Sequence, residues 1–328
     1  MPQTLTEIKT LLSAHGLRPK HKFGQNFLHD GNQMRRIMDA AAIAPRDVVL
    51  EVGPGTGALT ERLLDAGADV VAVEIDPQLE PVLRHRLGSA LDRWVTDGGN
   101  SASEPHQNNP GDDPEAMPEG GDNDAAESWK ACGGEGGEGG ATLLIADVLA
   151  GKHRINPAVT AAVDARRGGR PFKLIANLPY NVASPLLANL VVDQPAMSDA
   201  VVMIQKEVAD RLAAPPGGKD YGPLGILIQA LCEVRTVGTL APGCFWPPPK
   251  VASAVVHLRR RATPLTDDPA ALSATLQRLF TRRRKQLGAI LGRDTPLPDG
   301  IDPNARPESL SVEQLVALSR SLPRATGS

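Results

Sequence analysis

The stretch "VLEVGPGTGALTERLL" constrains the fold of this chain more than any other. A strand is expected from Asp47 to Gly53, and a glycine-rich turn then opens a helix over "ALTERLLDAG". Gly53, Gly55 and Gly57 can adopt positive φ and let the backbone approach a bound molecule closely. A strand, a glycine loop and a helix in this order are typical of the ligand-binding edge of a parallel α/β sheet.

Strand and helix patterns alternate along much of the remaining chain. Further strands are expected for "DVVAVEID", "ATLLIADVL", "FKLIANL" and "AVVMIQ", and helices follow most of them. This alternation predicts an α/β fold with a parallel, doubly wound, Rossmann-like sheet. Two segments, "LGILIQALCEV" and "SAVVHLRR", are expected to supply later sheet elements. After Arg261 the pattern becomes helical, so we expect a Rossmann-like domain over residues 1–262 and a small α-helical domain over residues 263–328.

Residues 97–140 differ in composition from the rest of the chain. They hold eleven acidic residues against one lysine, together with eleven glycines. Such a segment buries too little apolar surface to offset the entropy lost on ordering, so we predict a disordered insertion. We expect its deletion, from Gly99 to Gly139, to leave the function intact. Because the whole chain has a net charge of −3 and this segment has −10, the remainder has +7, which is compatible with a nucleic-acid partner.

Signals for membranes, secretion and metals are weak in this sequence. No run of 18 apolar residues occurs, and "MPQTLTEIKTLLSAHG" lacks the basic and apolar regions of a secretory signal. The three cysteines are far apart and lack the spacing of a metal site. We therefore expect a cytoplasmic protein without a membrane span or a metal centre. Nothing suggests an obligate oligomer, so a monomer is expected.

Acidic residues stand at the ends of the next two predicted strands. Glu74 follows Gly53 by twenty-one residues and could accept hydrogen bonds from both ribose hydroxyls, and Asp147 could meet an adenine amino group. The glycine spacing is not that of dinucleotide-binding proteins. With Glu51 the pattern is E-x-G-x-G-x-G, which resembles the first motif of class I methyltransferases that use S-adenosyl-L-methionine. The resemblance implies a loop lying against the methionine part of that cofactor, with Glu74 on its ribose.

The letters "NLPY" follow the fourth predicted strand. They resemble the [N/D/S]-P-P-[Y/F] motif of methyltransferases that act on exocyclic amino groups of bases. The side-chain oxygen of Asn177 and the carbonyl of Leu178 could accept the two protons of an adenine N6, and Pro179 would aim that carbonyl. Tyr180 would stack on the adenine, a contact worth roughly 1–3 kcal/mol per base. A sulfonium methyl group is already activated, so neither a metal nor a strong general base is needed.

Three longer segments narrow the resemblance: "HKFGQNFLHD", "MIQKEVADRLAAPPGGKDYGPLGILIQ" and "FWPPPKVASAVVHL". Outside residues 97–140 the chain is similar to the KsgA/RsmA family of small-subunit (16S) ribosomal RNA adenine N6,N6-dimethyltransferases. The resemblance implies dimethylation of two adjacent adenosines in a hairpin loop near the 3′ end of 16S rRNA, within the immature small ribosomal subunit. It also implies a set of cofactor-binding residues: Asn26, Leu28, Gly53, Glu74, Asp147 and Asn177. The implied catalytic residues are Asn177, Leu178, Tyr180 and Phe245, with Phe245 on the face of the adenine opposite Tyr180.

Two basic clusters could contact phosphates, which supply affinity for RNA. "RPKHK" covers residues 18–22, and "RRRK" covers residues 282–285 on an expected helix of the small domain. Three other functions stay open. The chain could be a large-subunit rRNA adenine methylase of the antibiotic-resistance type, or a DNA adenine methyltransferase, although such enzymes usually have a larger recognition domain. It could also be a non-catalytic ribosome assembly factor, against which the intact motifs argue.

Overall fold

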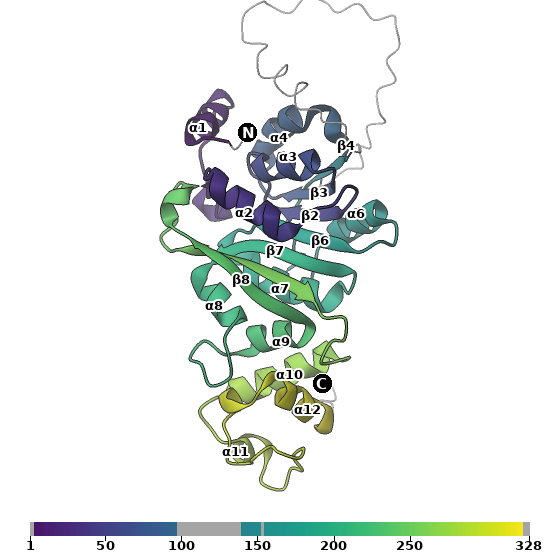
Figure 1. The fold of residues 1–328 in the computed structure, drawn as a ribbon, viewed down its shortest axis with the longest axis vertical. Coiled ribbons are helices and arrows are strands. Elements are labelled where there is room, and N and C mark those ends of the chain that lie inside the picture. The colour runs from purple at the N-terminus through teal and green to yellow at the C-terminus, as the bar shows by residue number, and fades with distance from the viewer. Residues whose placement is uncertain (1–2, 97–138, 152–153, 324–328) are drawn as a thin grey trace, which may run out of the picture.

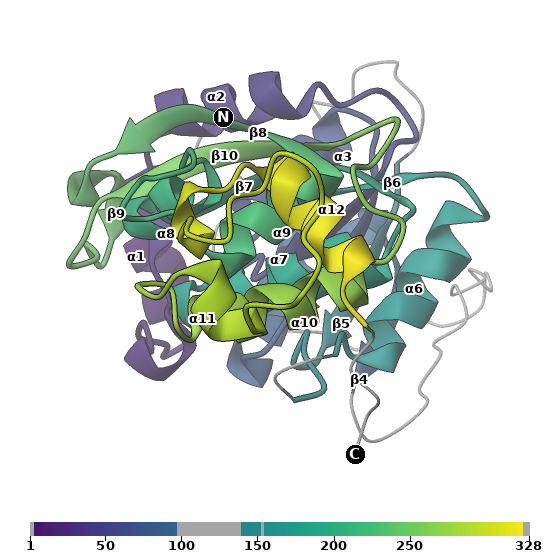
Figure 2. The same ribbon diagram turned by 90° about the horizontal axis from the view of Figure 1, so that it is seen from below.

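The computed structural model describes residues 3–96, 139–151 and 154–323, and Figures 1 and 2 show their arrangement. Almost all of the predicted insertion, residues 97–138, lies outside the described residues. Among the helices of these three ranges, none is long and apolar enough to cross a membrane.

The centre of the fold is an eight-stranded sheet in the order β4-β5-β3-β2-β6-β7-β10-β8. Its strands are β2 (Val48–Val52), β3 (Asp69–Glu74), β4 (Leu91–Thr96), β5 (Ala141–Ile145), β6 (Phe172–Asn177), β7 (Met197–Gln205), β8 (Cys232–Leu240) and β10 (Ser253–Arg260). Neighbours from β4 to β7 run parallel, whereas β10 is antiparallel to both β7 and β8. The doubly wound prediction therefore holds for six strands, and the sheet is mixed. The link from β8 to β10 has no α-helix, and a link without a crossover joins antiparallel neighbours.

The apolar run "LGILIQAL" forms helix α9 (Pro223–Leu231), and only the residues after it enter the sheet, as β8. The expectation of a sheet element there is wrong for the first part of the segment. A run buried on all sides has no periodicity that separates a helix from a strand. Pro223 at the first helical turn is the local feature that favours a helix, because its missing N–H has no partner there in any case.

Strand β4, which the sequence patterns do not predict, pairs in parallel with β5 at the edge of the sheet. A parallel pair needs a connection that crosses back along the strands, and such crossovers take a dozen or more residues. Deletion of Gly99–Gly139 would leave three residues between β4 and β5. That the deletion leaves the function intact stays a prediction, and the parallel pairing of β4 with β5 argues against it because three residues are too few for a crossover.

Helices cover both faces of the sheet (Figure 1). One face packs against α1 (Leu5–Ala14), α2 (Gly31–Ala41), α3 (Ala58–Asp65) and α4 (Glu80–Leu87). The other packs against α6 (Pro157–Arg167), α7 (Tyr180–Asp193), α8 (Lys206–Leu212), α9 and the C-terminal helices. Within β2, Val49 belongs to the first core, and Val48 and Leu50 belong to the second. This alternation is what a strand buried on both faces requires.

The C-terminal helices α10 (Pro269–Phe280), α11 (Leu287–Leu291) and α12 (Val312–Ser321) lie at one end of the molecule (Figures 1 and 2). Leu272, Leu276 and Leu315 belong to the same buried cluster as residues of the sheet. The helical character of this region is confirmed, and the domain boundary at residue 262 stays a prediction.

The basic cluster at residues 282–285 lies in a turn after α10, so the prediction that it lies on a helix is wrong. The amides of Arg282 and Arg283 donate to carbonyls three residues back, which is the tight winding that ends a helix. Arg282, Arg284 and Lys285 are exposed, whereas Arg283 pairs with Glu308.

Candidate active site

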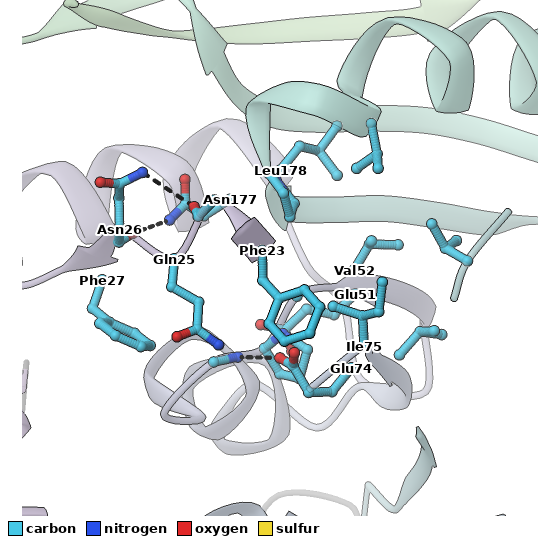
Figure 3. A pocket seen from close by; sticks show the side chains of 18 of the residues that line it. Phe23, Gln25, Asn26, Phe27, Glu51, Val52, Glu74, Ile75, Asn177 and Leu178 are labelled. Atoms are coloured by element: carbon cyan, nitrogen blue, oxygen red, sulfur yellow. Dashed lines mark hydrogen bonds between the residues drawn. The ribbon is translucent and has the colours of Figure 1, made fainter. Parts of the chain in front are cut away.

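A cavity of about 220 Å³ lies at the carboxyl ends of β2, β3 and β6, where ligands bind in open α/β sheets. Residues from Lys22 to Leu28 form part of its lining. The structure brings together on this lining eight of the predicted site residues: Asn26, Leu28, Gly53, Glu74, Asp147, Asn177, Leu178 and Tyr180. Figure 3 shows several of them around the opening. Their roles toward a ligand stay predictions.

The glycine loop after β2 lies between two other segments of the site. Gly53 has φ of 72°, and a Cβ there would stand 3.5 Å from the ring of Pro179. Gly55 has φ of 61°, and a Cβ there would stand 3.1 Å from the ring of Phe27. Glycine is therefore required at both positions for backbone conformation, and at Gly55 also for space.

Glu74, the last residue of β3, is only 3% exposed. Its Oε2 accepts the amide of Gly55 at 3.2 Å, and its Oε1 accepts the amide of Asp76 at 2.9 Å. Burial raises the pKa of Glu74 to about 7, although these backbone hydrogen bonds oppose the shift. The loop after β2 is thus fixed to the end of β3 by one carboxyl group.

Glu51 of β2 is 1% exposed and lines the same cavity. Among the described residues, its Oε2 has no hydrogen-bond partner. Burial raises the pKa of Glu51 to about 8, and the nearby Glu74 adds to the shift. A buried acceptor without a partner suits a ligand that brings a positive charge or a donor. Glu51 was not predicted as a site residue, because the sequence analysis used it only as part of a motif. Its position two residues before Gly53, at the end of the same strand, could have indicated that it lines the site.

Asp147 lies two residues beyond β5 and is exposed at the rim of the cavity. Its Oδ1 accepts the amide of Leu149 at 2.9 Å, so one carboxylate oxygen stabilises the turn. No other hydrogen bond to the carboxylate is formed within the described chain. The remaining acceptor is therefore available to a ligand at the rim.

The "NLPY" segment joins β6 to α7, and its side chains are held by distant parts of the chain. Asn177 Nδ2 donates to the carbonyl of Asn26 at 2.9 Å (Figure 3). The hydroxyl of Tyr180 lies 2.7 Å from Ser253 Oγ in β10. Burial raises the pKa of Tyr180 above its ordinary value. Leu178 is fully buried, and its amide donates to Met203 in β7 at 3.1 Å.

Phe245 is not part of the cavity lining, whereas Leu28, its partner in strand pairing, is. It is 3% exposed and belongs to β9 (Phe245–Trp246), which pairs antiparallel with β1 (Phe27–Leu28). Stacking of Phe245 on an adenine stays a prediction, and it requires the ring to become uncovered toward the cavity.

Two aromatic residues that sequence reasoning did not select do line the cavity, Phe23 and Phe27. Phe23 lines the cavity together with Glu51 and Glu74, and Figure 3 labels all three. The ammonium of Lys22 lies 4.5 Å from the Phe23 ring centroid. Only 3% of the residues in this chain are aromatic, and two of them lie within the segment "HKFGQNFLHD". This clustering could have indicated that both residues line the site.

Comparison with known proteins gives one consistent family. The sequence model described as "Ribosomal RNA adenine dimethylase" matches residues 16–96 and 150–322. The chain is 36% identical to the ribosomal RNA small subunit methyltransferase A of Mycolicibacterium vanbaalenii, over 95% of this chain and 88% of the relative. It is 35% identical to the protein of the same name from Rhodococcus opacus, over 97% and 93%.

Solved structures agree with these matches on the fold. A dimethyladenosine transferase from Plasmodium falciparum superposes with a TM-score of 0.62 and 23% identity, over 89% of this chain and 95% of that one. The 23S rRNA methyltransferase ErmE superposes with a TM-score of 0.57 and 24% identity, over 90% and 99%. The class I methyltransferase fold, with a helical C-terminal region, is thereby confirmed. From the sequence match and the shared fold together, the chain belongs to the ribosomal RNA adenine dimethylase family.

Proposed function

We propose that this protein dimethylates N6 of two adjacent adenosines in the hairpin loop near the 3′ end of small-subunit (16S) rRNA. The methyl donor would be S-adenosyl-L-methionine, and the substrate would be the immature small subunit. The observation that carries this proposal is that Asn177–Tyr180 and the glycine loop line one cavity. The names of the curated relatives support the small subunit as the target.

The residues of the cavity suit the proposed cofactor. Its methionine part has an ammonium and a sulfonium, and Glu51 offers a buried carboxyl oxygen without a partner among the described residues. Pairing with a positive group would favour the ionised form of Glu51 and lower its pKa from about 8. Glu74 and Asp147, at the ends of the next two strands, would meet the ribose and the adenine. When bound, the cofactor supplies an electrophilic methyl group.

The chain's own contribution would be to position and to hydrogen-bond the target amine. Asn177 uses Nδ2 for the carbonyl of Asn26, which leaves Oδ1 as an acceptor for an N6 proton. The Leu178 carbonyl would take the second proton. These two acceptors would draw the nitrogen away from conjugation with the ring, so its lone pair becomes a nucleophile. Tyr180, held by Ser253, would present a ring face to the flipped adenine.

Docking of the RNA would use exposed basic residues outside the cavity. Within the described residues, the side chains of Arg282, Arg284 and Lys285 form no hydrogen bond or ion pair. Lys22 lies on the rim of the cavity itself. Basic side chains at these places fit contacts to phosphates, which position an RNA without reading its sequence.

Incubation with labelled S-adenosyl-L-methionine tests the proposal. Undermethylated small subunits, large subunits and adenine-containing DNA are offered in parallel, and the labelled base is mapped. Label on N6 of two adjacent adenosines of 16S rRNA is expected. Label on large subunits or DNA alone, or no label on any substrate, would overturn the proposal.

The cellular setting follows from this substrate as part of the same proposal. Ribosomal subunits mature in the bacterial cytoplasm, so we place the activity there. We also propose that a monomer is the active form. Light scattering of the purified protein, alone and with small subunits, is the measurement, and a stable dimer would contradict it.

A further inference from the structure

The segment from Lys20 to Leu28, here called the lid, includes several residues that line the cavity. It begins with a 3-10 turn, His21–Phe23, and ends in the two-residue strand β1. Asn26 Nδ2 donates to the carbonyl of Gly24 at 3.1 Å, which shapes the middle of the lid. Such a short segment has little core of its own, so contacts with other segments determine where it lies.

The first end of the lid is held by one carboxylate, that of Asp76. Lys20 Nζ donates to Asp76 Oδ1 at 2.7 Å, and Gln25 Nε2 donates to Asp76 Oδ2 at 2.9 Å. The Asp76 side chain is 3% exposed and that of Lys20 is 26% exposed. Gln25 also accepts the backbone amide of Lys20 at 2.8 Å, which closes a ring of three residues. Hydrogen bonds to a charged group in a protected place are stronger than those at the surface.

Asp76 is itself fixed to the sheet. Its amide donates to Glu74 Oε1 at 2.9 Å, and its Oδ1 accepts the amide of Gln78 at 3.2 Å. Neither Asp76 nor Lys20 lines the cavity. These two residues can therefore be altered without removing an atom from the cavity wall.

The middle of the lid, at Gly24 and Asn26, meets the "NLPY" segment. A Cβ added to Gly24 would stand 3.4 Å from Cβ of Pro179, so the two backbones are in close contact. The carbonyl of Asn26 accepts Asn177 Nδ2 at 2.9 Å. A carbonyl oxygen has no proton to donate, so it fixes which end of the Asn177 amide faces the lid. The oxygen of that amide must then point away from the lid.

We propose that Asp76 is a positioning residue for methyl transfer. Through Lys20 and Gln25 it holds the lid over the cavity, and through the Asn26 carbonyl the held lid orients the amide of Asn177. The role of Asn177 in this inference rests on the proposed function. The part that concerns the position of the lid does not depend on it. Asp76 does not line the cavity, so it would act on the reaction only through these contacts.

The test uses two substitutions, Asp76→Asn and Lys20→Met, in the full-length protein. In Asp76→Asn, the new amide NH₂ faces the NH₂ of Gln25, so that hydrogen bond is lost. The side chain no longer carries a charge, so its contact with Lys20 is weakened. Lys20→Met keeps the apolar stem and removes the charge. Asp47→Asn is the matched control, because Asp47 also accepts a lysine at 2.8 Å and a backbone amide at 2.9 Å, and it lies at the amino end of β2.

Three quantities are measured: the dissociation rate of S-adenosyl-L-methionine, hydrogen exchange of residues 20–28, and kcat and KM for small subunits. Both test variants should release the cofactor about tenfold faster and exchange their lid amides faster, with a fall in kcat larger than any change in KM. The control should match the wild type in all three. Melting temperatures of all variants show whether the fold is retained.

Wild-type cofactor release and lid exchange in both variants would overturn the inference, while methylation by the wild type would still support the proposed function. Faster lid exchange with an unchanged kcat would remove the link to Asn177. Failure of the wild-type protein itself to methylate small subunits would instead count against the proposed function, and the exchange data would then stand alone.

Discussion

The two ends of the cavity are built in different ways. At the cofactor end, Glu51 lies within β2 and Glu74 is the last residue of β3. These two strands are paired neighbours in the sheet. At the target end, Asn177 depends on the lid and Tyr180 depends on Ser253, contacts that join residues far apart in sequence. The cofactor end is therefore a local product of strand, loop and helix. The target end exists only when several distant segments have assembled.

The largest effect is expected for a substitution at the target end, Asn177→Ala. Asn177→Ala should lower methyl transfer by about 10²–10³, the usual cost of losing one acceptor or donor in a transition state. RNA binding should be retained, because phosphate contacts lie elsewhere. Methylation of small subunits and a filter-binding assay measure the two quantities, with Asn304→Ala as a control in an exposed turn. Wild-type turnover in Asn177→Ala would show that the target end does not depend on this amide.

Charge reversal of Arg282, Arg284 and Lys285 should act on RNA docking alone. Each lost phosphate contact lowers the salt dependence of log K by about 0.7–0.9, so the slope should fall by about 2 to 3. Cofactor affinity should not change, because no residue of this turn lines the cavity. Arg211→Glu, at a helix position paired with Glu207, is the control. An unchanged slope would assign the cluster to a solvated surface.

The pH dependence of the free energy of unfolding tests the burial of Glu51 at the cofactor end. Its pKa is raised from 4.5 to about 8 in the folded protein, so between these values the native state binds more protons than the unfolded state. Stability without cofactor should therefore fall as pH rises through this window, with a slope approaching 1.4 kcal/mol per pH unit from this group. Glu51→Gln should flatten that slope, and Glu233→Gln, at an exposed position of β8, should not. Denaturant titrations from pH 5 to 8 measure it, and equal slopes in wild type and Glu51→Gln would contradict the burial argument.

The smallest effect is expected from shortening the insertion. Removal of residues 107–130 leaves twenty residues for the crossover between β4 and β5, and methylation should stay within about twofold of wild type. Removal of Gly99–Gly139 should instead lower the melting temperature, because β4 loses its parallel pairing. A large loss of methylation with the shorter deletion and an unchanged melting temperature would give the insertion a role at one end of the cavity.

The same contrast explains what could be predicted from the sequence. Gly53, Glu74 and Asn177 were found because strand ends and glycine loops are local patterns. The contacts of Asp76 with Lys20 and Gln25 have no local signal, since they form across fifty or more residues. Phe245 was expected at a ligand face, although an aromatic residue among prolines suits a core equally well. In the fold it pairs opposite Leu28 and is 3% exposed.

The pairing of β1 with β9 also has a consequence for protein synthesis. Phe27 lies opposite Trp246, so the last part of the lid is anchored by residues that leave the ribosome more than two hundred positions later. The strands of the cofactor end, by contrast, can pair as soon as they emerge. A nascent chain would thus have its glycine loop long before it has an anchored lid. Contacts of such sequence separation form late and slow folding, so an enzyme that modifies ribosomes would become complete only near the end of its own translation.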